Sequence, residues 1–295
     1  MKARHILGAM GFVLTLLADA AVAATPVKVI DTPAKEASGG IAEGWVGWST
    51  FTNGAWKAFV RPDGASARKI PTADSAFIGD IVLDGPRAGQ AVFWQFEGLD
   101  GQIKFYDLDT RNVLHAPAGV NTRKSEEFAS ASGDYMLFGR GPVSAVFQTQ
   151  VNLYRFSTNR TRRIASANEP ILTSDQVNGD YVAYTRCRNP CSVTRYRVST
   201  GRSLKMPAPP VGRANYYGAV LPDGTVYYVQ GNQRQCGKNT KMLRLRDGNV
   251  TTVTNMPDGI EMSALSADVV GGGPVVVFTR FNCATGRTGV YKVAG

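Results

Sequence analysis

The sequence predicts an all-β protein, a six-bladed β-propeller built from four-stranded antiparallel blades. Three observations predict it: a β-rich texture, a repeat of about 45 residues, and a segment near the N-terminus that can complete the last blade. The chain of 295 residues contains 32 Gly and 15 Pro, and almost no stretch has the apolar spacing of an amphipathic helix. The sequence therefore lacks the helical segments that an α/β fold requires.

A glycine before the second strand of each unit marks the repeat. These marker glycines are Gly44, Gly89, Gly133, Gly179, Gly224 and Gly272. The intervals between them are 45, 44, 46, 45 and 48 residues. Periods of about 40 to 50 residues are typical of propellers and other repeat arrays, and four short strands with short connections occupy that length. Six repeats therefore fill a propeller domain that we place at residues 25–295.

The four strands of a repeat follow one another in a fixed order. A strand rich in small residues, such as ILTSDQV at 171–177, is placed nearest the axis, because the strands converge there. After the marker comes an apolar run such as DYVAYTR at 180–186. An alternating run such as SVTRYRVST at 192–200 is third, as a half-buried strand requires. A short outer strand such as RTRRIA at 160–165 completes the blade.

The last repeat provides only three strands and would leave TGVYKV, at 288–293, on an open edge. Open sheet edges favour aggregation. The segment PVKVI, at 26–30, precedes the innermost strand of the first blade and has no other partner. We expect this N-terminal strand to pair with 288–293, complete the last blade and close the ring.

Residues 1–24 have the pattern of an export signal peptide. A basic start, MKARH, precedes an apolar run that ends in the small residues AVAA. A membrane anchor would need about 20 unbroken apolar residues, whereas Asp19 interrupts this run and no later stretch is apolar for long enough. We expect a secreted or periplasmic protein with no integral membrane segment.

The four cysteines predict two disulfides, because exported chains with an even cysteine count usually form them. All four fall in loops between the second and third strands of a blade. CRNPC can close on itself as Cys187–Cys191, while Cys236 and Cys283 occupy matching loops of blades 5 and 6 and are expected to pair. A four-cysteine zinc site is the alternative, but such sites favour two close pairs and only one is present.

The repeated turn and strand resemble the TolB-type, or WD40-like, β-propeller repeat. LPDGTVYYV at 221–229 carries the resemblance most fully, and RPDG at 61–64 matches it in part. The resemblance covers residues 26–295 and implies a propeller domain. It implies no single activity, because such propellers serve as binding platforms, as parts of larger enzymes and as enzymes themselves.

Arginines recur at the end of the second strand and in the loop that follows. The candidate ligand-binding residues are Arg140, Arg186, Arg188, Arg234, Arg280 and Arg287. Equivalent positions in a propeller form a ring on one face, and guanidinium groups suit carboxylate and phosphate partners. An acidic ligand over blades 3 to 6 is therefore expected. In the alternative interpretation these arginines cover apolar strand ends and bond to loop carbonyls.

Catalysis is the second hypothesis. Beyond the leader the chain has one histidine, His115, and no G-x-S-x-G elbow, so neither a serine hydrolase nor a three-histidine zinc site is expected. We expect no cofactor and no metal. Asp175, Glu261 and Asp268 lie on or near innermost strands and could serve a hydrolase or lyase as carboxylates in the axial channel.

The non-catalytic hypothesis fits the charge of the chain. Loss of Lys2, Arg4 and Asp19 with the leader lowers the formal net charge from +10 to +9. A basic protein outside the cytoplasm attracts polyanions. We expect a monomeric binding or scaffolding module whose partner is a protein or an acidic polymer of the cell envelope, and no nucleic acid. Alternation places Trp94 among the sheet-packing positions rather than on a sugar-binding surface.

Overall fold

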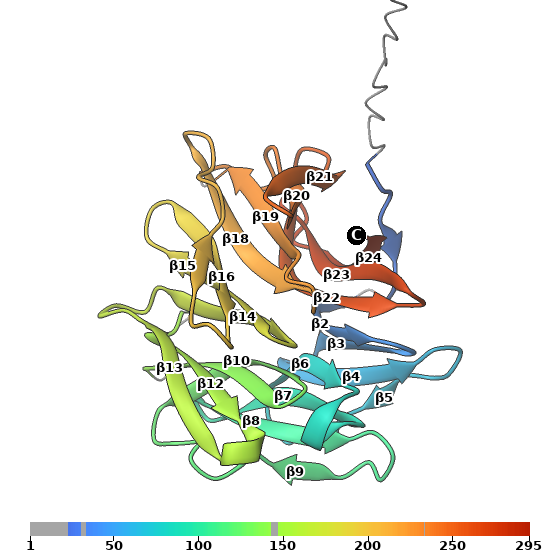
Figure 1. The fold of residues 1–295 in the computed structure, drawn as a ribbon. Coiled ribbons are helices and arrows are strands. Elements are labelled where there is room, and N and C mark those ends of the chain that lie inside the picture. Colours follow the sequence, from blue (N-terminus) through green and yellow to red (C-terminus); the bar gives the residue numbers. More distant parts are fainter. Residues whose placement is uncertain (1–22, 31–33, 143–146, 233) are drawn as a thin grey trace, which may run out of the picture.

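The computed structural model describes residues 23–30, 34–142, 147–232 and 234–295 and confirms the six-bladed β-propeller. Six four-stranded antiparallel sheets follow one another in chain order around a common centre (Figure 1). Blades 1 to 3 consist of β2 (Lys35–Ala42), β3 (Trp45–Thr52), β4 (Ala55–Pro62) and β5 (Arg68–Lys69); β6 (Ala76–Val82), β7 (Gln90–Glu97), β8 (Asp100–Asp107) and β9 (Val113–His115); and β10 (Ser125–Ser132), β11 (Tyr135–Gly141), β12 (Gln150–Arg155) and β13 (Arg160–Ser166).

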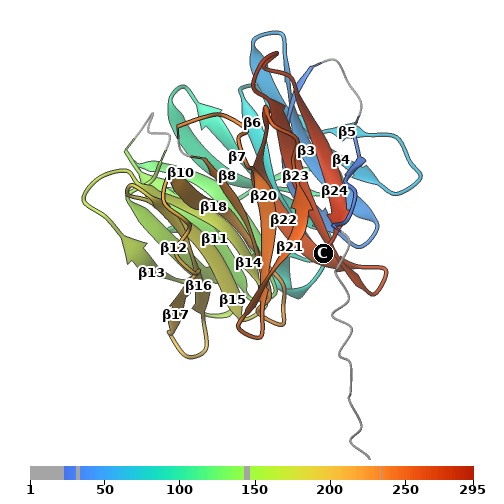
Figure 2. The same cartoon turned by 90° about the horizontal axis from the view of Figure 1, so that it is seen from above.

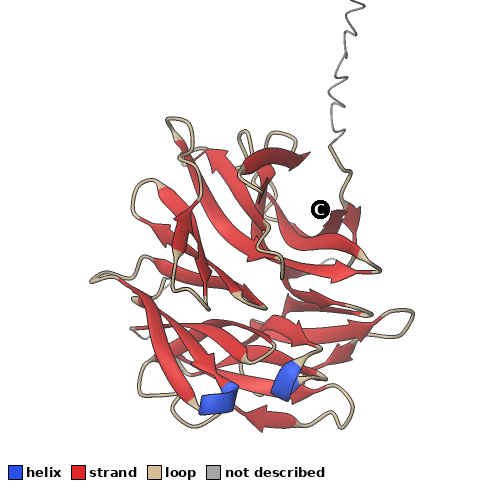
Figure 3. Cartoon of the chain, viewed as in Figure 1, coloured by secondary structure: helices blue, strands red, loops and turns tan. Residues whose placement is uncertain are grey.

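The second half of the chain repeats this order. Blades 4 to 6 consist of β14 (Leu172–Asn178), β15 (Tyr181–Cys187), β16 (Cys191–Arg197) and β17 (Ser203–Lys205); β18 (Arg213–Val220), β19 (Val226–Asn232), β20 (Lys241–Arg246) and β21 (Asn249–Asn255); and β22 (Ile260–Val270), β23 (Gly273–Asn282), β24 (Thr288–Ala294) and β1 (Val27–Lys28). Two short 3-10 helices, η1 (Gly85–Arg87) and η2 (Phe156–Thr158), are the helical segments of the described chain (Figure 3). None of the described helices is long and apolar enough to cross a membrane. All but the last two residues of the predicted export signal, 1–24, lie outside the described residues.

The ring is closed as predicted by the N-terminal strand. β1 pairs antiparallel with β24, with Val27 opposite Lys292 and Lys28 opposite Tyr291. In Figure 2 the red strands of blade 6 lie beside the blue strands of blade 1, and β2 packs against β22, β23 and β24. The edge of β24 is thereby covered by residues from the other end of the chain.

The hydrophobic core lies between neighbouring blades. One cluster joins Val92 and Phe105 of blade 2 to Met136 and Phe138 of blade 3, and all four side chains are fully buried. Similar clusters lie between other neighbouring blades. The alternation of apolar residues along the second and third strands therefore reflects sheet-on-sheet packing around the ring.

The recurrence of GDY and YRxST has a hydrogen-bonding cause. In blade 4 the Asp180 carboxylate accepts hydrogen bonds from Arg197 Nε at 2.8 Å, from Ser199 N at 2.7 Å and from Ser199 Oγ at 2.6 Å. The Arg197 guanidinium also covers the Tyr181 ring at 5.6 Å. Asp134 makes the same contacts in blade 3. The motif thus ties the turn after the innermost strand to the turn after the third strand.

Both predicted disulfides are present. Cys187 is bonded to Cys191 within blade 4, and Cys236 is bonded to Cys283 between blades 5 and 6. We call the end of the propeller that carries these loops the disulfide end. Three potential metal-ligating side chains meet at one place among the described residues, Cys236, Glu261 and Cys283, but the disulfide engages both sulfur atoms.

Candidate functional site

Each innermost strand carries a β-bulge at the same level of the ring. The register shifts fall between Ser38 and Ile41, Ile78 and Asp80, Glu127 and Ser130, Ser174 and Gln176, Tyr216 and Gly218, and Ser263 and Ser266. Bulges bend a strand and redirect its side chains. Three non-glycine residues in them, Phe128, Tyr217 and Ala264, have φ angles of +53°, +54° and +50°. Such left-handed conformations are uncommon and often occur at functional sites.

The bulges surround a cavity that receives residues from all six blades, which we call the axial cavity. Its volume is about 110 Å³. Blades 1 to 6 contribute, among others, Ser38, Gly79, Phe128, Asp175, Tyr217 and Leu265. This size suits a single side chain or functional group rather than a whole small-molecule ligand, which needs about 300 Å³ or more.

Glycine permits the close approach of the innermost strands on the side of blades 1 to 3. A Cβ atom added to Gly79 would lie 1.8 Å from the carbonyl oxygen of Ala129, and one added to Gly39 would lie 2.1 Å from Ile78 Cγ2. Larger residues occupy the bulges of blades 3 to 5. Backbone therefore forms part of the cavity wall, and side chains form the rest.

Gly79→Ala is expected to destabilise the protein by about 1 to 3 kcal/mol, because the added methyl group meets backbone that must move. Urea-induced unfolding followed by circular dichroism measures this change. Gly273→Ala is the matched control, since a Cβ atom at Gly273 has no neighbour within 4 Å. Equal unfolding midpoints for the two variants would show that the strands can separate without penalty.

Asp175 is the carboxylate of the axial cavity. It accepts hydrogen bonds from Thr173 Oγ1 at 2.8 Å, from Thr185 Oγ1 at 2.6 Å and from Gly218 N at 2.9 Å. Burial raises the pKa of Asp175 to about 6, although these hydrogen bonds favour the ionised form. The carboxyl group is therefore poised to gain or lose a proton near neutral pH.

Tyr217 lines the cavity beside Asp175. Burial, with the nearby charges of Glu261 and Asp175, raises the pKa of Tyr217 to about 12, so its hydroxyl stays protonated. The ring of Tyr216 packs edge-on against it at 5.3 Å. Glu261 influences this pair without lining the cavity, and burial raises its pKa.

A second cavity of about 260 Å³ opens at the other end of the axis. Its lining includes the carboxylates of Glu43, Asp80, Asp84 and Asp268, and it shares no lining residue with the axial cavity. Glu43 accepts a hydrogen bond from Gly271 N, as Asp84 does from the marker glycine of blade 3, so these groups link neighbouring blades. The three carboxylates predicted for catalysis are therefore dispersed. Asp175 lines the axial cavity, Asp268 lines the opposite mouth, and Glu261 lines neither.

Asp80 gives the stability of the protein a predictable pH dependence. Burial raises its pKa to about 8 from an ordinary value of 3.8, so the folded chain keeps a proton that the unfolded chain releases between these values. The free energy of unfolding should therefore fall as the pH rises from about 4 to about 8. Asp175 contributes in the same direction only up to about pH 6. Urea midpoints above that pH should decline less in Asp80→Asn than in the wild type, and parallel curves would contradict the assignment.

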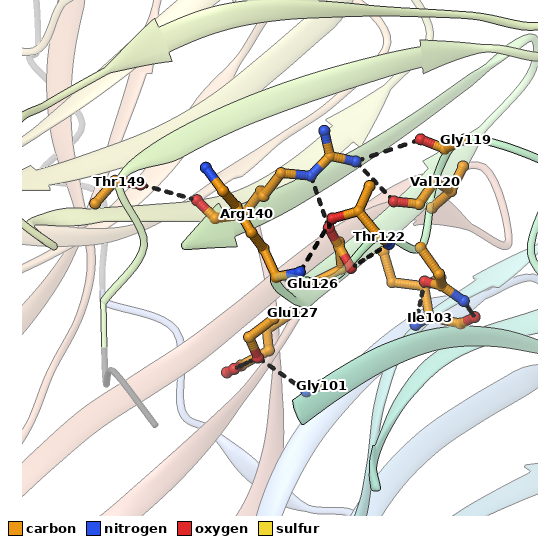
Figure 4. Close-up of polar contacts among 12 residues, drawn as sticks. Gly101, Ile103, Gly119, Val120, Thr122, Glu126, Glu127, Arg140 and Thr149 are labelled. Carbon is orange, nitrogen blue, oxygen red and sulfur yellow. Dashed lines mark hydrogen bonds and ion pairs between the residues drawn. The ribbon is translucent and has the colours of Figure 1, made fainter. Parts of the chain in front are cut away.

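Arg140 is held within its blade. Its Nε pairs with Glu126 Oε1 at 2.7 Å, and its second guanidinium nitrogen donates to the carbonyl oxygens of Val120 at 2.7 Å and Gly119 at 3.3 Å (Figure 4). The Glu126 side chain is fully buried and also accepts hydrogen bonds from Thr122. Arg140 thus fastens the segment before β10 to the end of β11.

Two other predicted arginines share one cleft. Arg280 and Arg287 line a cleft of about 680 Å³ beside the strand pairing that closes the ring, and Lys28 of β1 lines it too. We call this the closure cleft. The Arg280 guanidinium lies over the Tyr291 ring at 4.5 Å. None of the described residues that line the cleft is acidic.

The remaining predicted arginines lie elsewhere at the disulfide end. Arg186 donates to the carbonyl oxygen of Ser166 at 2.9 Å, and Arg188 is exposed on the CRNPC loop. Arg234 lines, with Arg213, a separate cleft of about 620 Å³. The six arginines therefore form no single ring-shaped site, and only Arg280 and Arg287 come together in one cleft.

Aromatic side chains form a feature that sequence reasoning missed. We call Phe51, Trp56, Phe77, Trp94, Phe96 and Phe128 the aromatic strip. Neighbouring rings lie 5.0 to 6.1 Å apart from blade 1 to the axial cavity, and all six rings are partly exposed. Phe51 and Phe96 follow their marker glycines by seven residues, the spacing of Arg140 and Arg186. This shared spacing in the sequence therefore predicts one face of the propeller that is aromatic in blades 1 and 2 and basic in blades 3 and 4.

No family profile and no curated protein matches the chain. Among solved structures, a putative TolB from Agrobacterium tumefaciens is similar with 11% identity and a TM-score of 0.59, covering 90% of this chain and 91% of that chain. An oligogalacturonate lyase in complex with manganese is similar with 11% identity and a TM-score of 0.54, covering 90% and 84% of the two chains. TolB from Acinetobacter baumannii matches with 17% identity and a TM-score of 0.49, and the chain spans 60% of that protein. The similarity to the Agrobacterium tumefaciens structure shows that the chain has the fold of the TolB-like propellers.

Proposed function

We propose that the protein is an exported, non-catalytic binding or scaffolding module that recognises an acidic ligand or envelope partner through the disulfide end. The observation that supports this proposal best is the closure cleft. Arg280 is oriented by stacking on Tyr291, which leaves the edge of its guanidinium group to donate hydrogen bonds. Arg287 adds a second guanidinium, and the cleft of about 680 Å³ has the size of a small-molecule site.

Export is supported by the two disulfides, which persist in oxidising compartments. Cleavage after residue 24 leaves β1 only a few residues from the new N-terminus. We place the mature protein outside the cytoplasm, secreted or periplasmic.

The proposed module acts as a monomer and without nucleic acid. Three outermost strands, β5, β9 and β17, are only two or three residues long. The longer β13 carries exposed Arg160, Arg162 and Arg163. Short or charged edges discourage pairing with a second chain.

The double variant Arg280→Ala/Arg287→Ala tests the closure cleft. It should bind immobilised polyglutamate and an immobilised acidic polysaccharide at least about tenfold more weakly than the wild type at low salt, because two charge-assisted contacts are lost. Arg202→Ala/Arg246→Ala removes the same charge from exposed positions at the other end and is the matched control. An equal loss of affinity in both double variants would mean unspecific attraction between opposite charges. Unchanged affinity in Arg280→Ala/Arg287→Ala would rule out the closure cleft as the binding site.

A hydrolase or lyase is the second candidate function, and the pKa of Asp175, about 6, is the observation that favours it. A two-carboxylate glycosidase mechanism needs a partner within about 10 Å, and no other carboxylate lines the described part of the axial cavity. Cleavage of acidic oligosaccharides by the wild type but not by Asp175→Asn would establish the enzyme. Equal activity in both would remove Asp175 from any such mechanism.

A further inference from the structure

The axial cavity combines three aromatic rings with one carboxylate, and the proposed binding at the disulfide end uses none of them. Trp94 comes from blade 2, Phe128 from blade 3, Asp175 from blade 4 and Tyr217 from blade 5. Four parts of the chain that are distant in sequence thus present their side chains to one small space. The polar cavity at the opposite mouth has no aromatic lining among the described residues.

The rings are fixed in position by the backbone and by each other. Trp94 and Phe128 lie with centroids 5.4 Å apart and planes inclined at 49°, so they form a corner rather than a flat stack. Phe77 supports Trp94 from a stacked position at 5.6 Å. Phe128 and Tyr217 are directed by bulges in the left-handed conformation. Preorganised ring faces carry negative electrostatic potential and attract cations.

Asp175 adds a negative charge without a counter-charge. Its carboxylate can accept about four hydrogen bonds, and the described structure shows three, from Thr173, Thr185 and Gly218. The group is half-buried, so part of it faces the cavity. No Lys, Arg or His is among the described residues that line this space. A cation in the cavity would favour the ionised carboxylate.

We propose that the axial cavity binds an organic ammonium group, either a small quaternary ammonium ligand or a lysine side chain of a partner, held against Asp175 by the rings of Trp94, Phe128 and Tyr217. A metal ion would need more oxygen ligands than one carboxylate among aromatic rings supplies. The volume of about 110 Å³ exceeds that needed for a few water molecules and fits one ammonium head group.

The test compares choline with its neutral isostere 3,3-dimethylbutan-1-ol, by calorimetric titration of the mature chain. Choline is expected to bind at least about tenfold more tightly, since the charge adds attraction to the rings and to the carboxylate. In Asp175→Asn this preference should fall several-fold, because only the rings still attract the charge. Equal binding of the two compounds by the wild type, or no binding of choline, would overturn the proposal.

A second variant is needed because Asp175→Asn disturbs three hydrogen bonds and could lose choline binding through misfolding. Trp94→Leu keeps the carboxylate and should also weaken choline binding by several-fold. Arg280→Ala/Arg287→Ala should bind choline like the wild type, which separates this site from the closure cleft. Unchanged choline affinity in both cavity variants would contradict the assignment, as would binding of methyl glucoside in place of choline, which would indicate a sugar site.

Two further measurements refine the ligand class. Tighter binding of Nα-acetyl-lysine methylamide, which keeps its ε-ammonium group, than of choline would identify a partner's lysine as the occupant. The reverse order would identify a small quaternary ligand. Choline affinity should rise as the pH increases through about 6, where Asp175 ionises. Tyr217, the other titratable group of the lining, stays neutral because its pKa is raised to about 12. A pH-independent affinity would exclude Asp175 as the counter-ion.

Discussion

Arg140→Ala is expected to destabilise the folded protein by about 3 to 5 kcal/mol, the range for breaking a buried ion pair from one side. The substitution would leave the fully buried Glu126 carboxylate without its 2.7 Å partner and would free two carbonyl oxygens before β10. For a domain of this size the melting temperature should fall by about 10 °C. Thermal and urea unfolding followed by circular dichroism measure both quantities.

Arg186→Ala is the matched control, because Arg186 occupies the same repeat position in blade 4 and its side chain donates to a carbonyl oxygen at an exposed site. Its loss should change stability by no more than about 1 kcal/mol. Glu126→Gln combined with Arg140→Met should be less destabilised than Arg140→Ala, since no unpaired charge remains. If Arg140→Ala instead retained full stability and lost affinity for acidic polymers, Arg140 would be a ligand-binding residue.

Removal of the disulfide between blades 5 and 6 should have an effect of similar size. Cys236→Ser/Cys283→Ser opens a loop with a sequence separation of 47 residues, which corresponds to about 4 kcal/mol on the chain-entropy account. Cys187→Ser/Cys191→Ser opens a ring with a separation of only 4 residues and should lose about 2 kcal/mol. Urea midpoints of the two double variants give the comparison.

Wild-type protein treated with a reductant should unfold at the lower of these midpoints or below it. If the Cys187–Cys191 variant were the less stable of the two, loop length would not determine the contribution of these disulfides. The order of the midpoints therefore tests the physical account, and their absolute values test its magnitude.

The architecture could be predicted because it depends on spacing along the chain. Marker glycines at a steady interval define six blades, and a three-stranded last repeat requires a strand from elsewhere, which β1 supplies. The pairing of Cys236 with Cys283 followed from their matching places in adjacent repeats. Such inferences need no knowledge of where a side chain points.

The candidate sites depend on side-chain direction, which spacing does not give. A bulge adds a residue to a strand and shifts the alternation beyond it, so Asp175 lines the axial cavity while Asp268 of blade 6 lines the opposite mouth. Trp94 packs between blades as alternation predicted and also lines the cavity. Arg140 and Arg280 share a repeat position, but Arg140 pairs with the buried Glu126 whereas Arg280 lies over the Tyr291 ring.

The pairing of Val27 with Lys292 also determines when the molecule can finish folding. β1 has no partner until β24 has been synthesised, and contacts between such distant segments form slowly. Closure of the ring is therefore expected to be a late step of folding.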